Sequence, residues 1–458
     1  MQTAGDISRK HAVYNAITNE QRAFSFTAVV DCNSFYCSAE RVFRPDLFRK
    51  PVVVLSNNDG CIVSRSDESK TLGVGMAEPY FQARAIIEKN GIEVFSSNYN
   101  LYGDMSWRVM ETLRMIMGDD KVEVYSVDEA FINMDAVPFE KLHETAMQLR
   151  ITVEQWTGVE VSVGIAPTKT LSKVANHIAK KSKTKTNCVA VLDTIESVHE
   201  ALCVTPIKEI WGVGGQYAKK LNSFGIYDAY QLSKMPEEWG RKNLGGVVGV
   251  RLIKELKGEP FIGLDEELTV KKMIATTRMF GTPVTELCDI KEAVATYTSR
   301  AAEKLRRQNG AASVISVFVV PKEIRKPGEH FRHGPTVSKA MTLPHATCVT
   351  SELIKPAVEL AEKAYYETIC KYETNLFKKA GVMLSGIVHD STLQGNLFVP
   401  AVKNNNRMLM GMMDNINFSM RNDILKFAAS GTERNWKMRQ ELRSPRYTSR
   451  WDELREVR

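Results

Sequence analysis

Closely spaced cysteine pairs are missing from this chain. Its eight cysteines include no CxxC pair and no arrangement with histidine that resembles a zinc site. A small disulfide-rich fold or a structural zinc centre would need such pairs. We therefore expect a reduced intracellular protein with buried thiols and without a disulfide framework.

Long apolar runs are missing as well. The N-terminus is polar and mixed in charge, without the apolar core of a signal peptide, and no later stretch is long enough to span a bilayer. The sequence thus predicts a soluble, cytoplasmic protein. We expect residues 1–24 to form a short N-terminal extension, with a misassigned start as the alternative.

The composition leaves room for several domains and favours an anionic partner. The chain has 458 residues, 43% of them hydrophobic, which suggests two to four domains. Its net charge of +7 favours a polyanion. Two basic runs stand out, and each is either a solvated helix face or an anion-binding surface: Lys169, Lys173, Lys180, Lys181, Lys183 and Lys185, and then Arg300, Lys304, Arg306 and Arg307.

Two acidic clusters carry most of the chemical information. VVDCNSFY contains Asp31 and YSVDEAF contains Asp128 and Glu129, and each lies beside an apolar, strand-like run. Neighbouring residues on a regular strand point to opposite faces, so Asp128 and Glu129 can share a site only where the strand bends. Gathered carboxylates favour Mg²⁺, and with it metal-assisted phosphoryl transfer. Taken singly, Asp31 could instead cap a helix and the Asp-Glu pair could be a surface turn.

The N-terminal half alternates strands and helices. The pattern predicts strands over 28–31, 51–55 and 159–166, a return strand over 130–134, and helices over 33–41 and 168–181. Lys169, Lys173 and Lys180 fall within one broad face of the second helix.

A glycine-rich segment follows, IWGVGGQYAKKL over 210–221. Gly212 and Gly214 would let the backbone approach a phosphate near a helix N-terminus, with Lys219 and Lys220 just beyond. This looks like a helix-hairpin-helix that grips DNA, although an ordinary turn between helices has the same composition.

The C-terminal half has a different order of elements. Strands are predicted over 272–280, 312–320, 336–342 and 380–387, with helices over 289–308 and 353–372. That βαββαβ order is the split βαβ arrangement. We expect the methionines between Met408 and Met420 to form a helix core.

Several of these segments together resemble one family. VVDCNSFYCSAERVFRPDL, KPVVVLSNNDGCIVSRSDESKTLGV, FSSNYNLYGDMSWRVM, VYSVDEAF, VGIAPTKTLSKVANH, IWGVGGQYAKKL and SPRYTSR are similar to segments of the Y-family translesion DNA polymerases, and within them of the UmuC-type catalytic subunits of bacterial DNA polymerase V. The resemblance begins near Phe24 and runs nearly to the end of the chain.

The resemblance implies an α+β, right-hand polymerase. The expected domains are an N-terminal extension (1–24), a palm (25–41 and 97–187), fingers (42–96), a helical thumb with a helix-hairpin-helix (188–260), a linker (261–271), a βαββαβ little finger (272–388) and a C-terminal region that binds partners and the clamp (389–458).

It also implies roles for individual residues. Asp31, Asp128, Glu129 and the backbone carbonyl of Cys32 would hold two Mg²⁺ ions. Phe35 and Tyr36 would contact the nucleotide, with Tyr36 excluding a ribose hydroxyl, and Lys70 and Lys180 would hold the triphosphate. Some relatives carry arginine at the position of Lys70, which keeps the charge but adds a bidentate fork.

The implied activity is error-prone synthesis on primer-template DNA with dNTPs during the SOS response to DNA damage. The implied partners are a UmuD-type dimer, the RecA filament and the sliding clamp, the last through Gln394, Leu397 and Phe398 of LQGNLF. Many clamp peptides have leucine where this chain has Gly395. No exonuclease motif stands out. Three alternatives stay open: a self-sufficient polymerase of the polymerase IV type, a cyclase-like palm enzyme and a noncatalytic DNA-binding scaffold.

Overall fold

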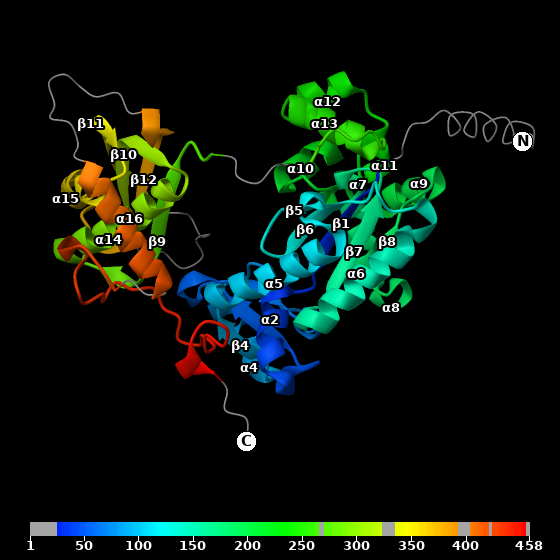
Figure 1. The fold of residues 1–458 in the computed structure, drawn as a ribbon, viewed down its shortest axis with the longest axis horizontal. Helices are drawn as coiled ribbons and strands as arrows, with labels where there is room; N and C mark the ends of the chain where they lie inside the picture. Colours follow the sequence, from blue (N-terminus) through cyan, green and yellow to red (C-terminus); the bar gives the residue numbers. More distant parts are fainter. Residues whose placement is uncertain (1–24, 265–269, 323–334, 393–403, 421–423, 455–458) are drawn as a thin grey trace, which may run out of the picture. The chain divides into compact units, whose positions relative to one another are not determined.

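A computed structural model describes residues 25–264, 270–322, 335–392, 404–420 and 424–454. It divides into two compact units, each described by itself (Figure 1). Unit 1 consists of residues 1–54, 62–267 and 443–458, and unit 2 of residues 55–61 and 268–442. The end of the chain therefore returns to the unit in which the chain begins.

A five-stranded sheet forms the centre of unit 1, in the order β5-β6-β1-β7-β8. Strand β1 lies in its middle and pairs antiparallel with β6 and β7, whereas β7 and β8 run parallel. The bounds are Thr27–Cys32 for β1, Val122–Val124 for β5, Glu129–Asn133 for β6, Val161–Ala166 for β7 and Val189–Val191 for β8. The predicted strands at 28–31, 130–134 and 159–166 are confirmed.

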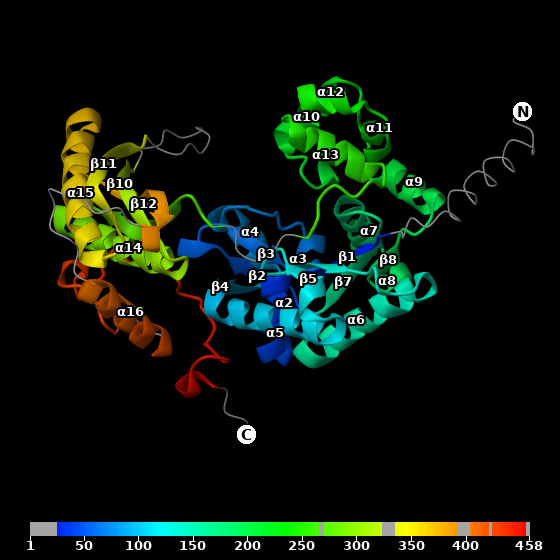
Figure 2. The ribbon, with the colours of Figure 1, turned by 45° about the horizontal axis from the view of Figure 1, so that its top comes forward.

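Helices cover both faces of this sheet (Figure 2). Helices α5 (Tyr99–Met117) and α6 (Leu142–Thr157) share an apolar core with Val163 and Ile165 of β7. Residues between these two on the strand point the other way. On that face lies α7 (Lys169–Lys181), the predicted basic helix.

Gly164 sets how closely α7 approaches the sheet. A Cβ atom there would lie 2.3 Å from the backbone nitrogen of Asn176 and 2.4 Å from the backbone oxygen of Ser172. Any side chain would therefore push the helix away from β7. The glycine lets α7 lie against the sheet, and so brings its lysines toward the edge where β1 ends.

A second, three-stranded sheet has the order β3-β2-β4. Its strands are β2 (Val52–Leu55), β3 (Ile62–Arg65) and β4 (Glu93–Ser96), and the neighbouring helices are α2 (Phe35–Phe43), α3 (Asp67–Thr71) and α4 (Tyr80–Lys89). Helix α2 follows β1 directly and packs against α5 and β3.

Short helices complete unit 1, and those between residues 195 and 256 share an apolar core of their own. Residues of α7, including Leu171 and Val174, join this core. Two of the helices begin after glycines: α10 after Gly214, and α13 after Gly246, whose φ of 74° disfavours a side chain. The helices are α8 (Lys183–Thr186), α9 (Ile195–Val204), α10 (Gly215–Ser223), α11 (Ala229–Ser233), α12 (Glu237–Asn243) and α13 (Val247–Leu256).

Unit 2 is an antiparallel sheet of order β11-β10-β12-β9 packed against two helices. The elements are β9 (Ile274–Val284), α14 (Leu287–Arg307), β10 (Gly310–Pro321), β11 (Val337–Thr347), α15 (Thr350–Tyr372) and β12 (Phe377–His389). The predicted βαββαβ order is confirmed.

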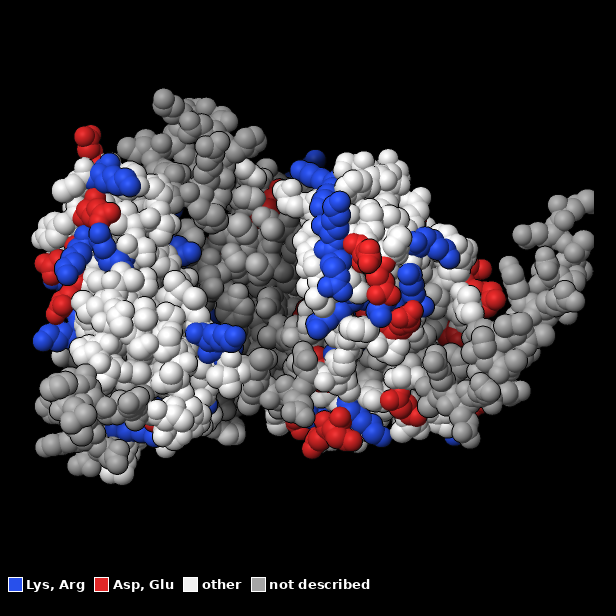
Figure 3. Space-filling model, turned by 90° about the horizontal axis from the view of Figure 1, so that it is seen from above, with Lys and Arg blue, Asp and Glu red and all other residues white. Residues whose placement is uncertain are grey.

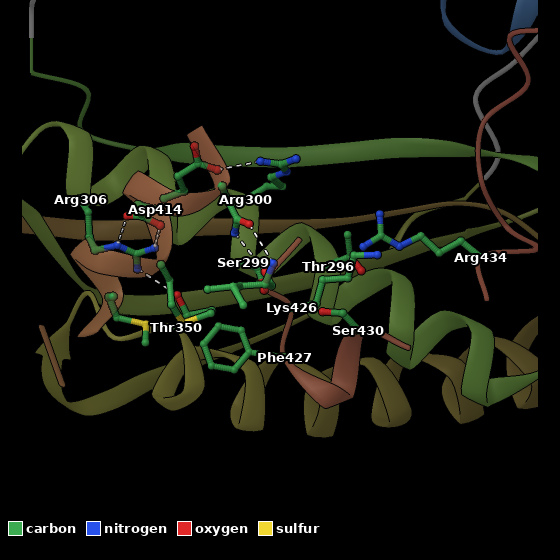
Figure 4. A pocket seen from close by; sticks show the side chains of 15 residues that line it. Thr296, Ser299, Arg300, Arg306, Thr350, Asp414, Lys426, Phe427, Ser430 and Arg434 are labelled. Atoms are coloured by element: carbon green, nitrogen blue, oxygen red, sulfur yellow. Dashed lines mark hydrogen bonds and ion pairs between the residues drawn. The ribbon is translucent and has the colours of Figure 1, made fainter. Parts of the chain in front are cut away.

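An additional helix, α16 (Asn404–Ser419), is held to α14 by charge. Arg306 donates to both carboxylate oxygens of Asp414 at 2.7 and 2.8 Å, and also to the carbonyl of Cys348 and the hydroxyl of Thr350 (Figure 4). Arg306, from the second basic run, thus has a structural partner on α16.

Two expectations about burial were wrong in part. Met410 is buried, but Met408, Met412 and Met420 are 67%, 56% and 58% exposed, so most of these methionines do not form a helix core. The eight cysteines are all unpaired, as expected, yet three are exposed: Cys203, Cys288 and Cys370. Within the described ranges, no helix combines the length and apolar character needed to cross a membrane.

Candidate functional site

Asp31 and Glu129 face each other at the end of β1. They are direct partners in the β1–β6 register, and their side chains share a hydrogen bond. Burial raises the pKa of Asp31 to about 7, outweighing the attraction of Lys180. Burial also opposes ionisation of Glu129, but the hydrogen bond from Asp31 and the ion pair with Lys173 lower its pKa overall. Burial thus raises the pKa of Asp31, whereas the hydrogen bond and the ion pair lower that of Glu129.

Three lysines of α7 point toward carboxylates of the sheet. Lys180 Nζ lies 2.5 Å from Asp31 Oδ1, Lys173 Nζ lies 2.9 and 2.8 Å from the two oxygens of Glu129, and Lys169 Nζ lies 2.5 Å from Glu123. The predicted common face of the three lysines is confirmed. These amines neutralise the negative charge gathered at the edge of the sheet.

Lys173 also lies among aromatic rings. Its Nζ is 4.7, 5.6 and 5.3 Å from the ring centroids of Tyr125, Phe131 and Trp211. The indole of Trp211 donates to the hydroxyl of Tyr125 at 3.2 Å. These cation–π contacts restrict the ammonium that faces Glu129.

Asp128 belongs to the turn between β5 and β6, which provides the predicted bend. Its carbonyl accepts a hydrogen bond from the Cys32 N–H at 2.8 Å, but its carboxylate accepts one from the Ser126 hydroxyl at 2.5 Å. Among the described residues, no three acidic, histidine or cysteine side chains are gathered as a metal site. The structure therefore pairs Asp31 with Glu129 and holds the third carboxylate on Ser126.

The side chains nevertheless suit a hard divalent cation. The available donors are carboxylate oxygens, which Mg²⁺ prefers. The positive charge that Lys173 and Lys180 supply is the charge that a bound cation would supply instead.

Of the residues predicted to contact a nucleotide, Phe35 and Tyr36 lie at the start of α2, and Lys70 reaches the same place from α3. Lys70 Nζ is 3.1 Å from the hydroxyl of Ser34, the residue before the helix, and 2.7 Å from Asp67. The ring of Phe35 is buried. The ring of Tyr36 stacks on that of Tyr102 at 4.4 Å and 14°.

The glycines of the predicted helix-hairpin-helix are accessible. Gly212 has a φ of +88°, and a Cβ built on Gly212 or Gly214 meets nothing within 4 Å. Lys219 is exposed, whereas Lys220 donates to the carbonyl of Asn243 at 2.8 Å. Lysine and arginine side chains form a stripe across the face of unit 1 in Figure 3.

Some site features were missed by the sequence analysis, and one lies outside the structure. No local pattern indicated the aromatic rings around Lys173 or the hydrogen bonds that Tyr102 and Ser444 donate to Glu40, because these partners are distant in sequence. The predicted clamp peptide, Gln394, Leu397 and Phe398, lies outside the described residues.

Three family models match the chain. The impB/mucB/samB family matches residues 30–177, and the C-terminal domain of the same family matches residues 271–397. A domain of unknown function, DUF4113, matches residues 407–457. These matches include both acidic clusters, the βαββαβ part and the end of the chain.

Curated relatives match nearly the whole chain. Protein UmuC of Salmonella typhimurium is 40% identical over 94% of this chain and 100% of the relative, and protein ImpB of the same species is 37% identical over 93% and 98%. DNA polymerase IV of Bacillus velezensis is 25% identical over 73% and 77%.

Solved structures agree with this assignment at the level of the fold. A Y-family DNA polymerase chimera of Dbh and Dpo4 superposes with a TM-score of 0.64 at 22% identity, covering 79% of this chain and 99% of that one. The expected polymerase fold is confirmed. The chain belongs to the impB/mucB/samB family.

Proposed function

We propose that this chain is an error-prone translesion DNA polymerase of the UmuC type that acts in the SOS response. The observation that supports this most directly is the pair of cross-strand carboxylates, Asp31 and Glu129, opposed by Lys180 and Lys173 at one edge of the sheet. They lie in a chain that is 40% identical to UmuC over 94% of its length.

The proposed metal ligands are Asp31, Asp128, Glu129 and the backbone carbonyl of Cys32. When bound, two Mg²⁺ ions would activate the primer 3′-hydroxyl and neutralise the charge of the leaving pyrophosphate. Asp128 reaches this arrangement by exchanging its hydrogen bond with Ser126 for a place beside Asp31.

The triphosphate is proposed to bind between two lysines. Lys70 lies beside Ser34 at the start of α2, and Lys180 contacts Asp31 at the end of β1. Both amines can turn to phosphate oxygens, and positioning together with charge neutralisation accounts for most catalysis of this reaction. The first backbone N–H groups of α2, from Phe35 onward, add to the positive potential there.

Selection of the sugar is proposed to depend on Tyr36. Its ring follows the metal-binding strand within the first turn of α2 and is held flat against Tyr102. A ring fixed there would clash with a ribose 2′-hydroxyl. Stacking limits the freedom of the ring to move aside.

DNA is proposed to contact the thumb through backbone groups and charge. Gly212 and Gly214 leave their backbone open, and Lys219 is exposed nearby. Such contacts are independent of base sequence. A UmuD-type dimer, the RecA filament and the sliding clamp are proposed as partners on the basis of the family, the clamp through Gln394, Leu397 and Phe398.

The decisive experiment is primer extension on undamaged and abasic templates with Mg²⁺ and all four dNTPs. The UmuD-type partner, activated RecA and clamp are added in turn. Asp31→Asn and Asp128→Ala should abolish extension while primer-template binding is nearly unchanged. Asp120→Asn, which alters an exposed carboxyl of the same unit, is the matched control and should extend normally.

Each result has a defined meaning. Extension by the chain without partners would indicate a self-sufficient polymerase of the polymerase IV type. Absence of extension under every condition, despite tight DNA binding, would favour the noncatalytic scaffold. Replacing Mg²⁺ with Ca²⁺ or Mn²⁺ in the same assay tests the identity of the metal.

A further inference from the structure

The end of the chain packs beside α2 and α5 within unit 1. We name residues 443–447 the return segment. Arg443 forms a parallel bridge with Ser96 at the end of β4. The Asn98 side-chain amide donates to the carbonyl and hydroxyl of Ser444, both at 3.0 Å, and to the carbonyl of Pro445 at 3.2 Å. Asn98 and Ser444 are both buried, so these bonds fix the segment in place.

The return segment continues this network to a buried carboxyl group. The hydroxyl of Ser444 donates to Glu40 Oε1 at 2.9 Å, and the hydroxyl of Tyr102 donates to the same oxygen at 2.7 Å. Glu40 has no exposed surface, and its other oxygen has no hydrogen-bond partner among the described residues. A buried acceptor that depends on two donors loses much of its stabilisation when one is removed.

Tyr102 connects Glu40 to the nucleotide site. Its hydroxyl is held by Glu40, and its ring lies against Tyr36 at 4.4 Å and 14°. Tyr99 meets Tyr36 edge to face at 6.0 Å and lies 6.1 Å from Tyr102, so it flanks both stacked rings. The position of the Tyr36 ring is therefore set by that of Tyr102, which is set by Glu40.

The other end of α2 has a separate contact with the return segment. Tyr447 stacks on Phe43, the last residue of α2, at 4.8 Å and 12°. The two contacts, at Glu40 and at Phe43, fix both the tilt and the position of the helix that carries Tyr36.

We propose that the return segment is a positioning element for sugar selection: through Ser444, Glu40 and Tyr102 it holds Tyr36 where it excludes a ribose. The inference rests on the proposed function, since it takes Tyr36 to be the residue that excludes ribonucleotides. The return segment lies inside the match to the domain of unknown function at residues 407–457. The proposal therefore also gives a role to the C-terminal part of that domain.

The size of the effect follows from the bond that is lost. Ser444→Ala removes one donor to Glu40 and leaves the Tyr102 ring less restrained. We expect the ratio of kcat/KM for a ribonucleotide to that for the matching deoxyribonucleotide to rise about fivefold, since reactive geometry is sensitive to small displacements. The rise should come from the ribonucleotide, with kcat/KM for the deoxyribonucleotide changed less.

The test is single-nucleotide insertion of CTP and dCTP opposite template G by the full chain, with the partners that its activity requires. Ser449→Ala is the matched control. It removes a hydroxyl from the same tail, and that hydroxyl makes no side-chain hydrogen bond within the described residues. Its ratio should equal that of the unsubstituted chain. Tyr36→Ala should raise the ratio most, because it removes the ring itself.

The double variant Ser444→Ala/Tyr36→Ala separates positioning from general damage. If Ser444 acts through Tyr36, the double variant has the same ratio as Tyr36→Ala alone. A further rise would overturn the proposed route. If Ser444→Ala does not fold, Tyr102→Phe makes the same test, because it keeps the stacked ring and removes only the bond to Glu40.

The failures can be told apart. A chain that extends no primer fails the proposed function. A Tyr36→Ala variant with an unchanged ratio rejects Tyr36 as the selecting residue. A raised ratio in Tyr36→Ala, with an unchanged ratio in both Ser444→Ala and Tyr102→Phe, overturns the positioning role alone.

Discussion

Glu40 is a buried carboxyl outside the candidate metal ligands whose ionisation differs clearly from that in solution. Burial raises its pKa to about 7, although the hydrogen bonds from Tyr102 and Ser444 and the charge of Arg44 oppose the shift. The carboxyl therefore titrates near neutral pH in the folded protein, but near 4.5 in the unfolded chain.

This shift predicts a pH dependence of stability. Between pH 4.5 and about 7 the folded protein keeps a proton that the unfolded chain has released, so the free energy of unfolding falls as pH rises through that window. The full effect is about 3 kcal/mol, from roughly 1.4 kcal/mol per pKa unit. Urea unfolding of unit 1 at closely spaced pH values would measure it.

Glu40→Gln is the comparison for this prediction. The amide cannot titrate, so the difference in unfolding free energy between variant and parent should change across the window and stay constant above about pH 8. A constant difference from pH 4.5 to pH 8 would mean that Glu40 ionises normally in the folded protein.

The sequence predicted the positions of some site residues but not the contacts of others. The strand pattern before Asp31 and the bend at Asp128 are local, so the carboxylates were found from their own segments. Glu40 and Ser444 are separated by 404 residues, and neither carries a pattern that names the other. Hydrogen bonds between side chains so far apart in sequence depend on how the helices and strands pack, and hydrophobic periodicity does not describe that packing.

At the scale of elements, α7 shows why a sequence pattern succeeded. The spacing of Lys169, Lys173 and Lys180 places them on one face of a helix, and a regular helix keeps that relation wherever it packs. The distance of that face from the carboxylates is a separate matter. It depends on Gly164, which the periodicity of neither element identifies.

Gly164→Ala should therefore damage both stability and the site. The atoms that a Cβ would meet, at 2.3 and 2.4 Å, belong to the backbone of α7, so relief requires moving the helix. We expect a loss of about 3 kcal/mol in the free energy of unfolding, at the upper end for overpacking. Primer extension should fall as Lys180 and Lys173 withdraw from Asp31 and Glu129.

The matched control is Gly103→Ala in α5, where an added Cβ meets nothing within 4 Å. It should raise stability by up to about 1 kcal/mol, because alanine favours a helix over glycine. Equal changes in the free energy of unfolding for the two substitutions would show that the close approach of α7 to β7 at Gly164 does not restrict the residue at that position.

Helix α10 makes a prediction about DNA. Lys219 is exposed, whereas the Lys220 amine already donates to the carbonyl of Asn243. Lys219→Ala should weaken binding of all DNA sequences and lower the slope of log K against log salt by about 0.9, the value for one phosphate contact on duplex. Lys220→Ala should lower it less.

Fluorescence anisotropy of labelled primer-template across a salt series measures both slopes. Lys89→Ala, at the end of α4, serves as the control for a change in net charge alone. A slope reduced equally in all three variants would indicate general electrostatic attraction rather than a contact of α10.

At the scale of the whole molecule, the course of the chain matters as much as its two cores. Residues 55–61, between β2 and β3, belong to unit 2, and residues 443–458 belong to unit 1. Within unit 2, the Asn58 amide donates to the carbonyl of Phe280 at 2.8 Å, and Trp436 is buried in the core. Neither exchange was predicted, because the sequence placed residues 55–61 within the fingers and residues 389–458 in a separate C-terminal region, and contacts between distant segments leave no local pattern.

Ending the chain at Leu442 tests this division. The truncation removes Ser444 and Tyr447 from unit 1 but leaves Trp436 in unit 2. The opening free energy of α2 should fall by roughly 3 kcal/mol, from lost buried hydrogen bonds and the exposed ring of Phe43. Hydrogen exchange should therefore quicken in α2 and the first turn of α5, and stay unchanged in α14 and α15.

A chain ending at Leu454 is the control, since it retains the return segment and the pairing of Arg446 with Glu453. Its exchange should match that of the full chain in both units. Loss of protection in α14 together with α2 would mean that the two units unfold as one, and that the end of the chain stabilises both. Protection lost in α2 alone would mean that the return segment stabilises unit 1, the unit that carries Asp31, Tyr36 and Lys180.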